Sequence, residues 1–260
     1  MLASDTFFRQ VPKALEVRQR LILEGAGWAI NSIYWAFDQL KAAAREVKFD
    51  AAGHDSEHGI FVSCWSIIDQ CHMLRKLLSE LPILPGGPTE YFIKNYERVT
   101  LIRNAMDHLH NQLNNLAESK KQRPPIFGVL SFCMFTDDDM AEQPDGSKKA
   151  LGCQVVALTA GSLTHQNHTW HIANPTGKRI EVPLGCFEFE AFDHIVSFSE
   201  LIEDVNALVN HYNTEIKQKI DEGIRAAASE KGLDTEAVLK ERGGGGIKIA
   251  MKVRFSDADN

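Results

Sequence analysis

The sequence predicts an α+β protein in which four long helices form an antiparallel bundle, with an antiparallel sheet of four to five strands inserted between the third and fourth helices. Two observations lead to this fold class. Before residue 124, three long segments carry apolar side chains at helical spacing. From residue 124 to about residue 194 the pattern becomes one of short apolar runs and alternation, typical of strands, and helical spacing then returns. Residues 243–260 add a glycine-rich joint and a last predicted strand.

Composition narrows the class of protein. The 260 residues are enough for one large or two small domains with a substantial core, and 44% hydrophobic with 24% charged residues is ordinary for a globular chain. The net charge of -7 argues against a protein that coats nucleic acid non-specifically, although a local cleft of positive potential is compatible with it.

The cysteines and the N-terminus predict a cytoplasmic location. The five cysteines are an odd number without a C-x-x-C pair, and most lie in apolar runs, which predicts free buried thiols in a reducing compartment. The chain begins without a signal-peptide pattern and contains no uninterrupted run of 18 apolar residues. We therefore expect no membrane partner.

The first two helices are predicted from apolar stripes. Residues 1–11 are expected to be a poorly ordered lead-in, and a helix follows from Pro12 to about Lys48, with proline acceptable in its first turn. Trp28, Tyr34 and Trp35 are interpreted as core packing, with a ligand-stacking platform as the alternative. A polar break over residues 50–58 precedes the second helix, from about residue 59 to residue 81.

The third helix, over residues 90–118, has an unusual polar side. Prolines and glycines at 82–88 precede it. Beside its apolar stripe, four side chains at steps of four, three and four form one polar ridge, and two more lie further round the helix. The ridge consists of Arg103, Asp107, His110 and Asn114, and the residues further round are Asn104 and His108.

The run R-N-A-M-D-H from Arg103 to His108, on a helix of a helical bundle, resembles the R-x4-6-H motif of the HEPN superfamily, often written R-N-x-x-x-H. The resemblance implies a HEPN-like bundle and a homodimer that cleaves RNA without a metal or another cofactor. It also implies that Arg103 and Asn104 orient the phosphate and that His108 acts on the 2′-hydroxyl or the leaving oxygen. A guanidinium suits the first role and an imidazole the second. The resemblance also suggests a defence or stress role.

His110 is a second candidate for the histidine. Arg103 to His110 is R-x6-H, and seven residues bring two helical side chains to within about 20°, whereas the five residues to His108 leave them about 140° apart. The R-N-x-x-x-H form favours His108, which a two-fold dimer can bring in from another angle.

The residues near the motif either support the candidate site or have no part in it. Asp69 and His72, with Arg75, follow at steps of three on the second helix and either face the Arg103 ridge as a second layer or form a local surface cluster. Arg103 and Asp107 also have the spacing of an ordinary helix-surface ion pair. A non-catalytic HEPN-like module that binds a nucleotide or a protein is therefore the alternative function, and a plain structural domain is a third.

The sheet region is predicted as an antiparallel meander, separated by turns at residues 137–148 and 174–178. The expected strands lie within residues 126–136, 151–161, 164–173 and 179–192. The acidic segment at 137–145 is interpreted as a solvated loop because it lacks the spacing of a calcium-binding loop. His165, His168 and His171 alternate on a strand, so no metal site is expected there.

The fourth long helix is predicted from Ser197 to about Gly223. It opens with a Ser197-x-x-Glu200 capping box. A short helix near residues 235–242 and an alternating strand over residues 246–255 complete the chain. Gly243–Gly246 has no following Lys-Ser or Lys-Thr, so it is not interpreted as a phosphate loop.

Overall fold

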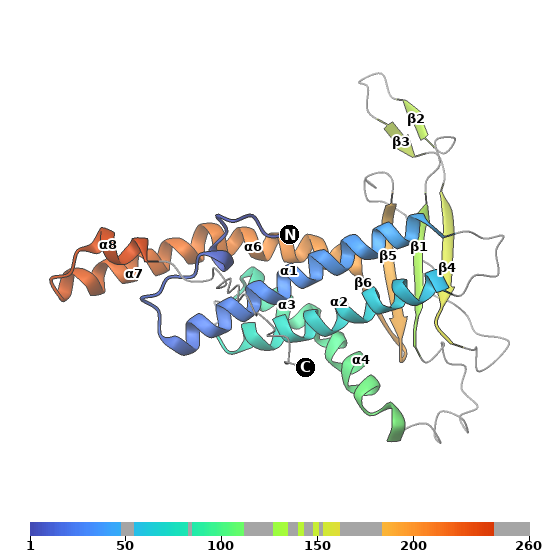
Figure 1. Ribbon diagram of the computed structural model, residues 1–260, viewed down its shortest axis with the longest axis horizontal. Coiled ribbons are helices and arrows are strands. Elements are labelled where there is room, and N and C mark those ends of the chain that lie inside the picture. Colours follow the sequence, from blue (N-terminus) through green and yellow to red (C-terminus); the bar gives the residue numbers. More distant parts are fainter. Residues whose placement is uncertain are drawn as a thin grey trace, which may run out of the picture.

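The computed structural model describes residues 1–47, 55–82, 85–111, 127–134, 140–142, 148–150, 153–161 and 184–241. These residues form a set of helices with a four-stranded antiparallel sheet at one end (Figure 1), so the α+β class is confirmed. The strands predicted at 164–173 and 246–255 and the glycine run at 243–246 lie outside the described residues.

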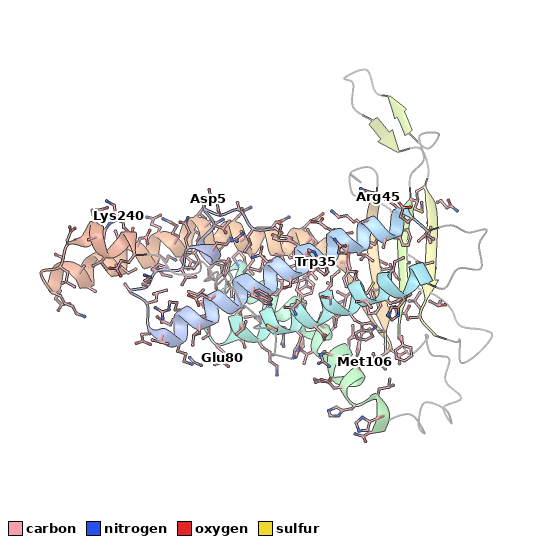
Figure 2. All side chains as sticks on the ribbon, in the orientation of Figure 1. Asp5, Trp35, Arg45, Glu80, Met106 and Lys240 are labelled. Carbon is pink, nitrogen blue, oxygen red and sulfur yellow. The ribbon has the colours of Figure 1, made fainter. Side chains whose placement is uncertain are left out.

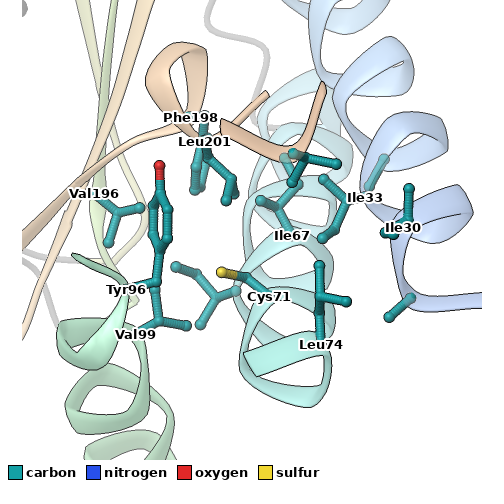
Figure 3. Packing of buried hydrophobic residues seen from close by; sticks show 14 of the residues in the cluster. Ile30, Ile33, Ile67, Cys71, Leu74, Tyr96, Val99, Val196, Phe198 and Leu201 are labelled. Atoms are coloured by element: carbon teal, nitrogen blue, oxygen red, sulfur yellow. The ribbon is translucent and has the colours of Figure 1, made fainter. Parts of the chain in front are cut away.

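Helices α1 (Val17–Arg45) and α2 (Asp55–Ser79) lie side by side and reach the sheet with their connected ends (Figure 1). Their contact surface is built from fully buried aliphatic side chains, which is what the apolar stripes predict. Figure 3 shows α2 between two partners. Ile67, Cys71 and Leu74 of α2 lie between Ile30 and Ile33 of α1 and Tyr96 and Val99 on the other side.

The third predicted helix is interrupted, so the prediction of one helix over residues 90–118 is wrong. It forms α3 (Pro88–Asn95) and α4 (Glu97–Asp107), and residues 112–118 lie outside the described part of the chain. Tyr96 lies between them with φ -100° and ψ 21°, and its hydroxyl donates to Asp204 Oδ2 at 2.6 Å. The ring of Tyr96 is buried, and a straight helix would move both the ring and its hydroxyl away from their partners. These contacts therefore keep the junction between α3 and α4 bent. As a result α4 projects away from the α1–α2 pair (Figure 1).

The sheet has the strand order β4-β1-β5-β6, which corrects the predicted meander. β1 lies between β4 and β5 and is antiparallel to both. The hairpin from β5 to β6 was not predicted: Phe192 and Asp193 form its two-residue turn with φ of 51° and 65°, an uncommon conformation for phenylalanine and one without an Asn-Gly signal. The strands are β1 (Val129–Met134), β4 (Gln154–Thr159), β5 (Leu184–Ala191) and β6 (His194–Ser197).

A second, two-stranded ribbon extends from the sheet (Figure 1). β2 (Met140–Glu142) pairs antiparallel with β3 (Lys148–Ala150). The segment predicted as a turn, residues 137–148, therefore contains β2 and the first residue of β3. Residues 143–147 between them lie outside the described residues.

Phenylalanines join the sheet to the helices. Phe187 and Phe189 are two residues apart on β5, so their side chains share a face, and both are fully buried. Phe187 packs edge-on against Phe37 of α1 at 5.5 Å between ring centroids. Phe189 packs edge-on against Trp65 of α2 at 5.4 Å. The sheet thus fixes the ends of α1 and α2.

The last helical part is longer than predicted and contains a π-helical turn. Ser197 caps it by accepting a hydrogen bond from the backbone N–H of Glu200 at 3.3 Å, which confirms the predicted start. The wider turn places Asn213 toward the N-terminal segment. The elements are α6 (Phe198–His211), the π turn η3 (Tyr212–Ile216), α7 (Lys217–Glu230) and α8 (Thr235–Lys240).

The N-terminal segment is docked, which corrects the prediction of a poorly ordered lead-in. Its short 3-10 helix, η1 (Phe7–Arg9), buries Phe7 and Phe8. The backbone N–H of Phe7 donates to Asn213 Oδ1 at 2.7 Å. Gly27 permits the contact with α1, because a Cβ there would lie 2.8 Å from the carbonyl oxygen of Phe8.

The two tryptophans of α1 are not core residues, so that interpretation was wrong for them. Trp28 is 70% exposed and Trp35, labelled in Figure 2, is 55% exposed. The side of α1 that faces the core carries Ala26, Ala29 and Ala36, small residues that allow close packing of helices. Tyr34 is partly buried, donates to Asn206 Oδ1 at 2.6 Å, and burial raises its pKa to about 12.

Candidate functional site

Arg103 is held by two carboxylates where α4 packs on α2. Its Nε lies 2.5 Å from Oδ1 of Asp69 on α2, and its Nη1 contacts Oδ1 of Asp107 one turn further along α4. The Arg103 side chain is 31% exposed, so the guanidinium remains open to solvent on one side. Asp69 therefore faces Arg103, as one of the two interpretations of the α2 flank expected, and the ordinary helical pair with Asp107 forms as well.

The charge balance around Arg103 is unfavourable for a passive phosphate site. The guanidinium contacts two carboxylates whose combined negative charge exceeds its own, and Arg75 and Lys76, which act on the nearby His72, offset part of this excess. A guanidinium carries five N–H donors, however, so two carboxylate contacts do not exhaust it. Arg103 is oriented in advance, and an anionic ligand has to compete with one of the two aspartates.

A second layer of polar contacts lies behind the Arg103 pair. Thr100 Oγ1 accepts a hydrogen bond from Arg75 Nη1 at 3.0 Å and lies 3.2 Å from Nδ1 of His72. Arg75 Nε also donates to the carbonyl oxygen of Ile93 at 2.7 Å. Because the threonine oxygen accepts from Arg75, its hydroxyl proton is available for His72 Nδ1, which favours a neutral His72 with its proton on Nε2. This layer connects α2, α3 and α4.

Burial and neighbouring cations lower the pKa of His72 from its ordinary value. Burial is the largest cause, and Lys76, Arg103 and Arg75 add to it, whereas Asp69 acts in the opposite direction. A neutral imidazole avoids placing another positive charge beside these three cations.

The free energy of unfolding should fall as the pH drops below the ordinary histidine pKa of 6.5, because the unfolded chain then binds a proton at His72 that the folded protein binds less well. Urea unfolding of the wild type and of His72→Gln at about pH 7.5 and about pH 5.5 measures this dependence. We expect a smaller loss on acidification in the variant. An equal loss in the two proteins would show that His72 does not contribute.

The remaining motif residues lie around the end of α4. Asn104 is exposed, and its carbonyl oxygen accepts a hydrogen bond from the backbone N–H of His108 at 3.1 Å. His108 ends the helix with φ -101° and ψ 13°, and both His108 and His110 are exposed. Since α4 stops at Asp107, the angular argument that pairs Arg103 with His110 no longer holds. Within the described ranges, no hydrogen bond or ion pair joins Arg103 to either histidine.

The described residues offer no ready metal centre. No group of three or more His, Cys, Asp or Glu side chains among them is arranged to hold an ion. His165, His168, His171 and Asn114 lie outside the described residues. Cys64, Cys71 and Cys133 are buried free thiols, while Cys153 and Cys186 are partly exposed.

Sequence reasoning missed a groove next to the Arg103 site. It has a volume of about 1110 Å³ and lies among α2, α4 and the sheet. Asp69 lines this groove as well as holding Arg103. The sequence signal for Phe61 and Trp65 was only an apolar stripe, because the opposite wall comes from residues that are distant in the chain.

Comparisons with protein-family models, with curated proteins and with solved structures find no match to this chain. In the part of the chain that the structure describes, every helix is too short or too polar to cross a lipid bilayer.

Proposed function

We propose that this protein is a HEPN-like, metal-independent endoribonuclease that acts as a homodimer. The observation that carries the proposal is the arrangement at α4: Arg103 is fixed in place by two carboxylates, Asn104 is exposed on the same helix, and His108 is exposed at the C-terminal end of that helix. This combination offers a cation for a phosphate, an amide for orientation and an imidazole for proton transfer.

The proposed reaction needs only groups that the RNA and these side chains supply. His108 takes the proton of a 2′-hydroxyl, and the O2′ atom attacks the adjacent phosphorus. The bond from phosphorus to O5′ breaks, the leaving oxygen takes up the proton that His108 removed, and the products are a 2′,3′-cyclic phosphate and a 5′-hydroxyl. Arg103 stabilises the charge that builds on the phosphate oxygens, and Asn104 orients them.

RNA binding in this proposal requires an exchange of partners at Arg103. Asp107 is the carboxylate that gives way, because it belongs to the last turn of α4, whereas Asp69 lies in the middle of α2. Asp69 keeps its contact with Nε and holds the guanidinium plane. The phosphate then accepts from the other side of the guanidinium fork.

In this proposal a dimer brings together the two catalytic side chains, which point in different directions within one subunit. Arg103 and His108 are five residues apart and point about 140° apart on an ideal helix. Two-fold pairing of the projecting α4 helices would place His108 of the partner subunit opposite Arg103. The proposal therefore requires a dimer in solution.

The test is cleavage of a mixed-sequence RNA by the wild type in EDTA, with analysis of the product ends. We expect cleavage that leaves 2′,3′-cyclic phosphate and 5′-hydroxyl ends, because the 2′-hydroxyl is the nucleophile and no metal is needed. A folded dimer that leaves RNA intact would contradict the proposal. Cleavage that EDTA abolishes would contradict it as well.

A non-catalytic binding module is the second candidate. The engagement of Arg103 by two carboxylates and the net charge of -7 favour it, since both weaken a general attraction for RNA. In that case the same face would bind a nucleotide or a protein without bond cleavage. Saturable nucleotide binding without cleavage would favour this candidate over the ribonuclease.

A further inference from the structure

The groove beside Arg103 has the size and lining of a ligand site. Its volume of about 1110 Å³ lies slightly above the usual range for small-molecule sites, roughly 300–1,000 Å³. It lies between the outer face of α2, the side of α4 that carries Met106 (labelled in Figure 2) and the sheet. Its lining includes Trp65, Ser66, Asp69, Gln70, Phe127 and Gly161.

In the aromatic wall of the groove, Trp65 is held in place by its contacts and Phe127 is partly exposed. The indole N–H of Trp65 donates to the carbonyl oxygen of Phe127 at 3.0 Å, which ties α2 to the start of β1. Trp65 also packs on Phe189, so its position is set by the core. Phe127 is 44% exposed. Such a half-open aromatic surface offers ring faces on which a planar ligand can stack.

The charge of the groove favours a neutral ligand group over a phosphate. Among the described residues of its lining, only His58 and Asp69 are titratable, and Asp69 is already paired with Arg103. A phosphate would find no lysine or arginine among the lining residues that the structure describes. A planar, uncharged and mainly apolar group fits better.

Polar side chains of the groove can form hydrogen bonds with the edge of such a planar ligand. Ser66 offers a hydroxyl, and Gln70 lines the groove with an amide whose Oε1 is buried and has no hydrogen-bond partner among the described residues. Rotating this amide toward the groove would break no bond to Oε1, so the oxygen is available for an N–H donor on a ligand. Nucleobases present such donors along their pairing edges.

The groove is continuous with the proposed catalytic site through Asp69. The same carboxylate lines the groove and contacts Arg103 Nε at 2.5 Å. A ligand group in the groove would therefore be next to a phosphate held at Arg103. This is the order of groups along a nucleotide, in which a base and a phosphate are joined through the sugar.

We propose that the groove between α2, α4 and the sheet binds one unpaired base of single-stranded RNA, stacked against Phe127 and Trp65, next to the phosphate at Arg103. This proposal rests on the proposed ribonuclease function and names its substrate class. Paired bases in a duplex cannot enter, because their faces are stacked and their edges are occupied. The protein is thus selective for single strands.

The binding test uses the His108→Ala dimer, so that cleavage does not interfere. Fluorescence anisotropy measures the affinity of this dimer for a labelled single-stranded RNA and for a blunt duplex of the same sequence. The same two affinities are then measured for the protein that also carries Phe127→Leu. Leucine keeps an apolar side chain and removes the ring. Tyr91→Leu on α3 is the matched control, because Tyr91 is 56% exposed and is not a lining residue of the groove.

We expect Phe127→Leu to weaken single-strand binding about tenfold, in line with the loss of one stacked base, and to leave duplex binding unchanged. Tyr91→Leu should bind like its parent. Equal single-strand affinity in Phe127→Leu and its parent would overturn the proposal, and so would equal weakening of single-strand and duplex binding.

Cleavage by the otherwise wild-type protein separates this proposal from the proposed function. If the wild type cleaves RNA but Phe127→Leu does not change single-strand binding, the base-binding groove is wrong and the ribonuclease stands. If Phe127→Leu weakens single-strand binding but the wild type does not cleave, the groove stands and the ribonuclease is wrong. An RNA with one abasic position gives a second check: it should lose affinity for the parent and not for Phe127→Leu.

Discussion

Replacing His108 by alanine is expected to lower the rate of RNA cleavage by at least about a hundredfold, which is the lower end of what a general acid–base group contributes. The proposed mechanism assigns proton transfer to this imidazole, and alanine provides no group to replace it. Cleavage rates under single-turnover conditions measure the effect on the chemical step.

His110→Ala is the matched control for this prediction. His110 is also exposed and lies two residues away, so the two variants make the same chemical change in almost the same place. We expect a small effect on cleavage and, for both variants, a change in stability below about 0.5 kcal/mol. A large loss in His110→Ala with full activity in His108→Ala would assign the proton transfer to His110 instead.

Replacing Phe8 by alanine is expected to lower the free energy of unfolding by about 3–5 kcal/mol, because a large buried ring is lost and a cavity remains. Phe8 is 2% exposed and its ring centroid lies 4.7 Å from that of Tyr212. The measurement is urea unfolding followed by circular dichroism.

Trp28→Ala provides the contrast, since it removes an even larger ring that is 70% exposed. Its effect should stay below about 0.5 kcal/mol. Similar losses in the two variants, or a loss only in Trp28→Ala, would contradict the packing described for the N-terminal segment and for α1.

The fold was predictable where a local pattern determines the structure. The apolar stripes indicated α1, α2 and α6, because a long helix can bury such a stripe in only one way. The bend at Tyr96 was not predictable, because it depends on a hydrogen bond to Asp204, 108 residues later. The docking of Phe8 likewise depends on residues that are distant in the sequence. One of them is Gly27, whose lack of a side chain leaves room for the contact. Apolar residues near a chain end look the same whether or not they find such a partner.

The candidate site was predictable only in part. The steps of three along α2 allowed Asp69 to face Arg103, and the structure brings the two together at 2.5 Å. Helical angles also suggested a partnership between Arg103 and His110, but α4 ends at Asp107 before such angles apply. The groove was missed because Phe127 and Gly161 join residues of α2 only in the folded chain.

A test with mixed subunits examines the shared catalytic cleft most directly. Arg103→Gln and His108→Ala chains carrying different affinity tags are allowed to exchange subunits, and the mixed dimers are isolated through both tags. Each variant alone should be inactive, whereas the mixed dimer should recover cleavage, because its cleft contains one intact arginine and one intact histidine from different chains. Isolated mixed dimers without cleavage, beside an active wild type, would contradict the shared cleft, and so would an active wild-type monomer.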